Sequence, residues 1–325
     1  MKLPRRQFLH LTAAAAALPA VSCIARAQAY PTRPVRLIVP IAPGGGSDIA
    51  GRLMGQWLSE RLGRPFVVEN RPGAGGTIGT EAVVRAPADG YTLLLCRTSN
   101  ATDAALYDKL NYNFIRDIAP VATITRESLV LVVNPSVPAN TLPEFLAYAK
   151  ANPRQINMAS AGTGTLAHVA GELFKMMAGI DMVHVPYRGG GPAQNDVLGG
   201  QAQVLFSTPS ASIAYIRAGM LRLLAVTTAT RSDTLPDIPT VSEFVPGYEA
   251  TFWSGICAPK NTPTEIIDKL NREINAALAD PELMRRLAEL GALAFASSPA
   301  EFGKLIANET EKWGKVVKFA GIKAD

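Results

Sequence analysis

Two segments of this chain share one pattern, in which a short apolar run leads into a glycine-rich loop and then an amphipathic helix. They span residues 37–48 and 156–165. Apolar runs that alternate with helical segments predict strands covered by helices, so the pattern indicates the α/β class. A helix N-terminus offers unpaired N–H groups and partial positive charge, and glycine lets a ligand come close to the backbone. Two such loops, about 115 residues apart, predict two half-sites that close on one small anion.

The first 29 residues have the composition of an export signal. A basic start at residues 2–6 precedes an apolar stretch at residues 9–21, which is too short to serve as a membrane anchor of the mature protein. Cleavage is expected after Ala27 or after Ala29. The sequence therefore predicts secretion of a chain that begins near residue 30.

The sequence does not decide between the possible export routes. Residues 5–9 resemble a twin-arginine signal, while Pro4 and His10 depart from that pattern. Cys23 follows a weak version of a lipoprotein signal, because Ala20 stands where a larger aliphatic residue is usual. We therefore expect Cys23 to be removed with the signal and expect no lipid anchor.

The charge of the chain lies mostly in this signal. Removal of residues 1–29 takes the formal net charge from +5 to +1, because the segment holds four basic residues and no acid. A nucleic-acid surface needs a dense cationic stripe, and none is visible in the remainder. No later segment is apolar for long enough to cross a membrane, so the mature protein should be soluble.

Two cysteines remain after the signal. Cys96 and Cys257 each end an apolar run, which is typical of a small buried side chain. An oxidising compartment also permits a disulfide between them if their strands are neighbours. Two cysteines with one or two histidines do not have the spacing of a metal site. We expect no metal and no cofactor.

The remaining chain is long enough for two lobes with cores of their own. We predict that residues 30–128 and 252–325 form lobe 1 and that residues 129–251 form lobe 2. Crossings near residues 126–131 and 248–253 would then make a hinge. The α/β alternation predicts two mainly parallel sheets flanked by helices, with a cleft between the lobes. Strands are expected at residues 35–39, 66–68, 92–95, 129–133, 156–159, 182–185, 204–206, 223–227 and 252–258.

Helix starts are marked by capping signals. Residues 141–144, 262–265 and 298–301 each place Ser or Thr three residues before Glu. Pro281 is expected to open a further helix. Other helices are predicted at residues 166–178, 192–198 and 210–218.

The first glycine-rich loop, residues 43–48, suits a carboxylate or a phosphate. It has no Walker lysine and no dinucleotide fingerprint. Asp48 can cap the following helix or orient a ligand or bridging water, and the two roles can coexist.

The second loop supplies the hydroxyls of Ser160, Thr163 and Thr165 beside two glycines. A hydrolase would need a nucleophile elbow and an oriented acid, and the sequence shows neither around Ser160 and His168. We therefore predict no catalytic residue. His168 is either a satisfied helix residue or a hydrogen-bonding partner of the ligand, and His184 is expected to be structural.

Further candidates lie where other predicted strands end. Thr98 and Ser99 follow one strand and Ser207 holds the matching place in the second lobe. Ligands of open α/β sheets bind at this carboxyl edge. Asp196 lies one turn into a helix and either faces the cleft or is a solvated acid favoured by the helix dipole.

Five motifs occur in one order along the chain. They are PGGGSD at residues 43–48, NRPGAGG at 70–76, DGYTL at 89–93, HVPYRG at 184–189 and LPDIPT at 235–240. This ordered set resembles the Bug-type solute-binding receptors of tripartite tricarboxylate transporters, and the resemblance covers residues 31–323.

The resemblance implies a two-lobed, type II-like periplasmic binding protein fold whose cleft takes a small carboxylate, an aromatic acid or an amino acid. It implies that the loops at residues 43–48 and 160–165 hold one carboxylate through backbone N–H groups and ordered waters. It also implies an aspartate near the other end of the ligand, at Asp196. The chain departs from the family pattern at residues 98–102 and 207–208, so the ligand itself is not implied.

Pattern and resemblance together give one set of expected ligand-binding residues: Ala42, Pro43, Gly44, Gly45, Asp48, Thr98, Ser99, Ser160, Ala161, Gly162, Thr163, Gly164, Thr165, His168, Asp196 and Ser207. We expect a monomeric periplasmic receptor that delivers its ligand to membrane transporter subunits and has no nucleic-acid partner. The alternatives are a ligand sensor for a membrane signalling protein and, less well supported, an esterase that uses Ser160.

Overall fold

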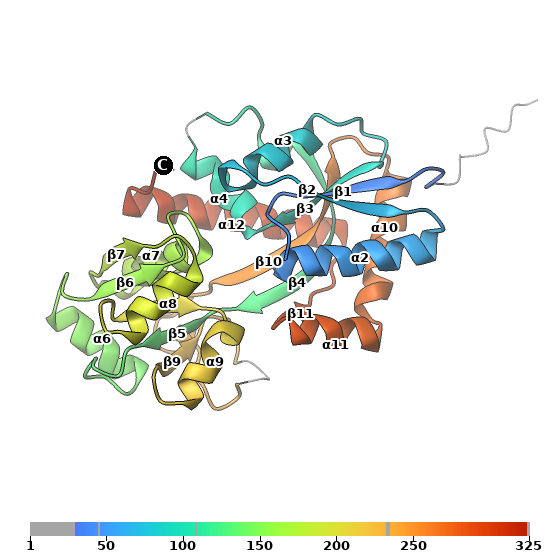
Figure 1. Cartoon of the computed structure of the whole chain (residues 1–325). Helices are drawn as coiled ribbons and strands as arrows, with labels where there is room; N and C mark the ends of the chain where they lie inside the picture. The colour runs from blue at the N-terminus through green and yellow to red at the C-terminus, as the bar shows by residue number, and fades with distance from the viewer. Residues whose placement is uncertain (1–29, 45, 108, 232–234, 324–325) are drawn as a thin grey trace, which may run out of the picture.

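The computed structural model describes residues 30–44, 46–107, 109–231 and 235–323. These residues form two lobes, each built on one sheet flanked by helices (Figure 1). The signal predicted at residues 1–29 and the candidate ligand residue Gly45 lie outside the described residues. The two-lobed α/β architecture expected from the sequence is confirmed.

The first lobe contains a six-stranded sheet in the order β11-β4-β10-β3-β1-β2. The strands are β1 Val35–Val39, β2 Phe66–Asn70, β3 Thr92–Arg97, β4 Ile118–Ser128, β10 Thr251–Pro259 and β11 Leu293–Ala294. β1 pairs in parallel with β2 and β3, whereas β10 runs antiparallel to β3 and β4. β11 is also antiparallel to β4.

The second lobe contains a five-stranded sheet in the order β7-β6-β8-β5-β9. Its strands are β5 Val130–Val133, β6 Asn157–Ser160, β7 Val183–Pro186, β8 Val204–Ser207 and β9 Arg222–Val226. β6 is parallel to β7 and β8, and β5 is antiparallel to β8 and β9.

Both sheets are therefore mixed, and the expectation of mainly parallel sheets was wrong. A βαβ unit makes neighbouring strands parallel because the helix returns the chain to the same edge. β4 instead runs almost directly into β5 of the other lobe, and β10 returns from there, so these strands oppose their neighbours. β4 was not predicted as a strand at all. Pro120 interrupts its pattern, and its pairing with β10 shifts register beside that proline.

Helices cover both sheets (Figure 1). They are α2 Gly46–Leu62, α3 Thr77–Val84, α4 Thr98–Leu106, α5 Phe114–Asp117, α6 Leu142–Ala151, α7 Leu166–Ala178, α8 Gly190–Leu198, α9 Pro209–Arg217, α10 Thr264–Leu278, α11 Pro281–Glu289 and α12 Pro299–Ala320, with 3₁₀ turns at Ala74–Gly76 and Val241–Glu243.

Two of the three predicted caps are confirmed. The hydroxyls of Thr141 and Ser298 accept hydrogen bonds from backbone N–H groups of the first turns of α6 and α12. Pro281 opens α11 as predicted. The cap expected at Thr262 was wrong, because its hydroxyl donates to the Pro259 carbonyl at 2.8 Å and α10 begins two residues later.

One hydrophobic core continues through both lobes at the crossing. Trp253 of β10 and Trp313 of α12 are almost fully buried in the same cluster as Phe174 of α7. α12 contacts α4 and β4 in the first lobe and α7 in the second. The C-terminal helix thus bridges the lobes behind the crossing segments.

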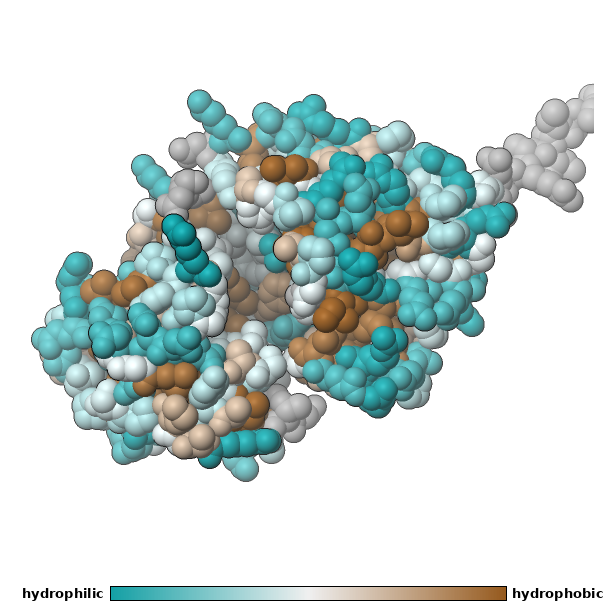
Figure 2. All heavy atoms as spheres, in the orientation of Figure 1, coloured by the Kyte–Doolittle hydropathy of each residue, from teal (hydrophilic) through white to brown (hydrophobic). Residues whose placement is uncertain are grey.

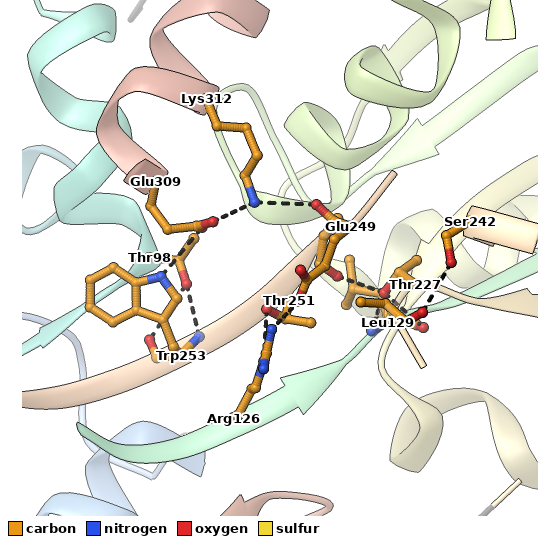
Figure 3. Close-up of polar contacts among 12 residues, drawn as sticks. Thr98, Arg126, Leu129, Thr227, Ser242, Glu249, Thr251, Trp253, Glu309 and Lys312 are labelled. Carbon is orange, nitrogen blue, oxygen red and sulfur yellow. Dashed lines mark hydrogen bonds and ion pairs between the residues drawn. The ribbon is translucent and has the colours of Figure 1, made fainter. Parts of the chain in front are cut away.

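Polar contacts hold the two crossing segments side by side (Figure 3). Thr227 Oγ1 accepts the N–H of Leu129 at 2.8 Å and lies 3.0 Å from the Leu129 carbonyl and 2.6 Å from the Ala250 carbonyl. Arg126 forms an ion pair with Glu249, and Lys312 Nζ donates to the Glu249 carbonyl at 3.2 Å. The two crossing segments therefore share a hydrogen-bonded centre at Thr227.

Cys96 and Cys257 are both buried and both free, so the disulfide left open by the sequence is not formed. Cys96 Sγ donates to the Gly255 carbonyl at 3.3 Å. No helix within the described part of the chain is both long and apolar enough to span a membrane.

Candidate functional site

A cavity of about 760 Å³ lies between the lobes, and Figure 2 shows the surface hollowed there. Its lining comes from the segments that follow β1, β3, β6, β7 and β8, where α2, α4, α7, α8 and α9 begin. Each helix N-terminus carries partial positive charge, so their convergence favours an anionic ligand. The volume falls within the usual range for small-molecule sites.

The start of α7 is the part of the lining best suited to bind an anion. Gly164, Thr165, Leu166 and Ala167 all line the cavity. The helix has no side-chain cap, and the hydroxyl of its first flanking residue, Thr165, instead donates to the Gly162 carbonyl at 2.7 Å. Among the described residues, the N–H groups of Leu166 and Ala167 have no hydrogen-bond acceptor. Two first-turn donors are therefore left for a ligand.

The first loop contributes Ile41, Gly46 and Ser47 to the same cavity. Asp48 is 1% exposed, and its Oδ2 accepts the Gly44 N–H and the Arg52 Nε–H, both at 3.0 Å. These bonds favour the charged carboxylate and hold the pKa of Asp48 below its ordinary value, although burial opposes them. Asp48 thus shapes the loop from behind, and the Gly44 N–H is already occupied.

The first-lobe wall carries charged side chains that the sequence analysis did not single out. Arg97, Asp103 and Glu127 line the cavity. Burial raises the pKa of Asp103 to about 7, against the opposing effect of Arg97, and burial raises the pKa of Glu127 to about 7 as well. Isolated charged residues have no spacing pattern, so the sequence held no signal for them.

The predicted ligand residues divide into two groups. Those that line the cavity are Thr98, Ser99, Ala161, Thr163, Gly164, Thr165 and Ser207, and those placed elsewhere are Ala42, Pro43, Gly44, Asp48, Ser160, Gly162, His168 and Asp196. Asp196 Oδ2 accepts a hydrogen bond from the Tyr187 hydroxyl at 2.6 Å. The structure thus brings both lobes' strand ends together, while the binding role of each residue stays a prediction.

His168 stacks on His184 behind the second loop, with ring centroids 3.5 Å apart. Its Nδ1 accepts the Gly164 N–H at 3.1 Å, so it supports the loop from the side away from the interlobe cavity. The pair lines a separate groove of about 880 Å³ with Glu172 and Lys175. Burial lowers the pKa of His168 to about 3 and that of His184 to about 4, so both rings are neutral at pH 7.

Ser160 and His184 are joined by a hydrogen bond of 2.7 Å between Oγ and Nε2, a distance that a nucleophile and its base would have. Ser160 is fully buried and lines neither the cavity nor the groove. Within the described part of the chain, no cluster of three or more His, Cys, Asp or Glu side chains could hold a metal ion.

Comparison with known proteins identifies relatives along nearly the whole described chain. Residues 50–322 match TctC, the tripartite tricarboxylate transporter family receptor. Protein BugT of Bordetella pertussis is 38% identical over 300 residues, which cover 91% of this chain and 92% of BugT. The structure of R. palustris Rpa4515 with adipate is 37% identical with a TM-score of 0.76, over 90% of this chain and 99% of that one. MatC from Rhodopseudomonas palustris with bound malate is 31% identical with a TM-score of 0.73, over 89% and 100% of the two chains.

Proposed function

This chain belongs to the TctC family of tripartite tricarboxylate transporter receptors, and from that premise we propose that it captures a small carboxylate between its lobes and delivers it to transporter subunits in the membrane. The family consists of solute-binding receptors and is not an enzyme family. Residues 1–29 would direct the chain to the periplasm, where it would act without a cofactor. The mature protein would bind its ligand as a monomer.

The observation that carries this proposal is the uncapped start of α7. A carboxylate placed there would accept the N–H groups of Leu166 and Ala167 and would lie at the positive end of a 13-residue helix. Gly164 before it has φ of +75°, and a Cβ there would lie only 2.8 Å from Leu106 Cδ1 of the first lobe, so glycine is required at this turn. The relatives with adipate and malate are consistent with a carboxylate as the ligand class.

Closure follows from the position of the site between the lobes. A ligand that touches the starts of α7 in the second lobe and α2 in the first binds a closed arrangement better than an open one. We propose that residues 30–128 with 252–325 and residues 129–251 move as two bodies about the crossing at Thr227. Hinge motions of this kind are common in periplasmic binding proteins.

A proline at position 166 tests the proposal. Leu166 is the first helical residue, and Thr165 before it has φ −66° and ψ 158°, a conformation compatible with a following proline. Leu166→Pro therefore keeps the helix and removes one N–H donor from the cavity. Leu166→Ala is the matched control, because it removes the same side chain and keeps the N–H.

Calorimetric titration with adipate and malate measures the difference. One charge-assisted hydrogen bond is worth about 1.5–3 kcal/mol, so Leu166→Pro should bind about tenfold to a hundredfold more weakly than Leu166→Ala. If the two variants bind a ligand of the wild type with equal affinity, the start of α7 is not part of the binding site. Thermal-shift screening of further dicarboxylates, aromatic acids and amino acids identifies the ligand, since binding raises the melting temperature by mass action.

A further inference from the structure

Three buried polar atoms on the first-lobe wall of the cavity have no hydrogen-bond partner among the described residues. They are Arg97 Nε, Ser99 Oγ and Asp103 Oδ2. All three residues line the cavity, and they come from the end of β3 and the first two turns of α4. Buried polar groups are almost always satisfied in native proteins, so three unpaired atoms within side chains that line one cavity call for partners from an occupant.

Of the three residues, Asp103 has the strongest need for a hydrogen-bond partner, because it is a carboxylate. Its side chain is 3% exposed and forms no hydrogen bond or ion pair with any described residue. The charged and titratable side chains that interact with it electrostatically are Arg97, Tyr107 and Tyr112. A buried carboxylate without a donor is costly, and a ligand donor would relieve that cost.

The wall is negative overall. Glu127 of β4 also lines the cavity and forms no ion pair with a described residue. Arg97 is the one basic residue in the lining, and its Nη2 already points to the Gly75 carbonyl at 3.4 Å. Two carboxylates therefore stand against one guanidinium, and a second carboxylate of a ligand would meet like charge here.

The two lobes thus offer different chemistry. The start of α7 presents N–H donors, whereas the first-lobe wall presents the carboxylates of Asp103 and Glu127 beside the Arg97 guanidinium, whose unpaired Nε is a donor. We propose that Asp103, assisted by Glu127, binds a protonated nitrogen at the end of the ligand remote from its carboxylate, so that the cavity prefers an amino-substituted carboxylate over the dicarboxylate of equal length. This inference rests on the proposed function, because it assumes that α7 holds the first carboxylate.

Matched ligand pairs test the preference. We would titrate the wild type at about pH 8 with 6-aminohexanoate against adipate and with 4-aminobutyrate against succinate. At this pH the side chains of Asp103 and Glu127 are mostly charged, because burial places the pKa of each carboxyl at about 7. The amino-substituted member of the bound pair should bind at least about tenfold more tightly, as one charge-assisted contact provides.

Substitutions at Asp103 and Glu127 test whether these residues cause the preference for the amino-substituted ligand. Asp103→Asn should abolish the preference or reverse it in favour of the dicarboxylate. Asp268→Asn removes the same charge from an exposed position on α10 and should leave the preference unchanged. Glu127→Gln is a second variant in case Asp103→Asn does not fold. It should also reduce the preference for the amino-substituted carboxylate over the dicarboxylate.

The outcomes separate this inference from the proposed function. If the dicarboxylates bind more tightly to the wild type, or if the preference survives both Asp103→Asn and Glu127→Gln, the inference is wrong and carboxylate capture stands. In that case Arg97 would be the residue that meets a second carboxylate. If no member of either series binds and no other carboxylate raises the melting temperature, the proposed function fails and the inference with it.

Discussion

The hydroxyl of Thr227 allows a sharp test of how the crossing between the lobes is held. Thr227 is fully buried, and its Oγ1 contacts the N–H of Leu129 and the carbonyls of Leu129 and Ala250 (Figure 3). Thr227→Val keeps the shape of the side chain and replaces the hydroxyl by a methyl group. The perturbation therefore removes hydrogen bonds at the crossing between the lobes and leaves the packing close to that of the wild type.

The magnitude follows from those contacts. The hydroxyl accepts the Leu129 N–H at 2.8 Å, and its single proton is directed to the Ala250 carbonyl at 2.6 Å, with the Leu129 carbonyl farther away at 3.0 Å. Each buried hydrogen bond contributes about 1 kcal/mol to the free energy of unfolding, so the variant should lose about 2 kcal/mol. For domains of 150–250 residues this corresponds to a fall in melting temperature of about 4–8 °C.

The neighbouring residue supplies the control. Thr228 Oγ1 is buried without a hydrogen-bond partner among the described residues. Thr228→Val should therefore be neutral or slightly stabilising, although the chemical change is the same. Urea unfolding followed by circular dichroism gives both free energies. If Thr227→Val costs less than about 0.5 kcal/mol, or if the two variants cost the same, the hydroxyl does not hold the crossing.

Two further predictions concern the site. Gly162 has φ of +131°, and an added Cβ would lie 3.2 Å from the Tyr187 carbonyl, so Gly162→Val should distort the second loop and weaken ligand binding by calorimetry more than about tenfold while the fold is retained. Unchanged affinity would show that this loop does not shape the site. Burial raises the pKa of Asp103 from 3.8 to about 7, so the folded state binds a proton that the unfolded chain has released, and its stability falls as the pH rises through that interval. Asn does not titrate, so Asp103→Asn removes this pH-dependent loss of stability. In urea unfolding, the free energy of unfolding of the variant should therefore rise relative to that of the wild type between about pH 4 and about pH 7. A difference between the two proteins that stays constant over this range would contradict the raised pKa of Asp103.

The sequence was most informative where local chemistry decides the structure. The bounds of α7 at Leu166–Ala178 were predicted as observed, because an apolar face follows a glycine-rich loop and ends at Gly179 in the left-handed conformation. The capping signals at Thr141 and Ser298 were confirmed for the same reason. The gathering of strand ends at one cavity also followed from the order of the elements.

The sequence was least informative where tertiary contacts decide. Thr98 and Ser99 were expected only to follow a strand, and no helix was predicted there, yet they open α4, where Asn100 Oδ1 accepts the Arg97 N–H at 2.9 Å. The direction of His168 could not be predicted either. It depends on how α7 packs against the sheet, at β6 and β8, which places the ring against His184 of β7 and on the lining of the separate groove.

The central claim is that a carboxylate lies at the uncapped start of α7 inside the interlobe cavity. A titration followed by ¹H–¹⁵N NMR, with adipate or malate as ligand, tests it most directly. The amide signals of Thr163, Leu166 and Ala167 should shift together and saturate with the calorimetric affinity. If saturable shifts cluster around Lys175 and Glu172 in the separate groove and spare the start of α7, the account is contradicted.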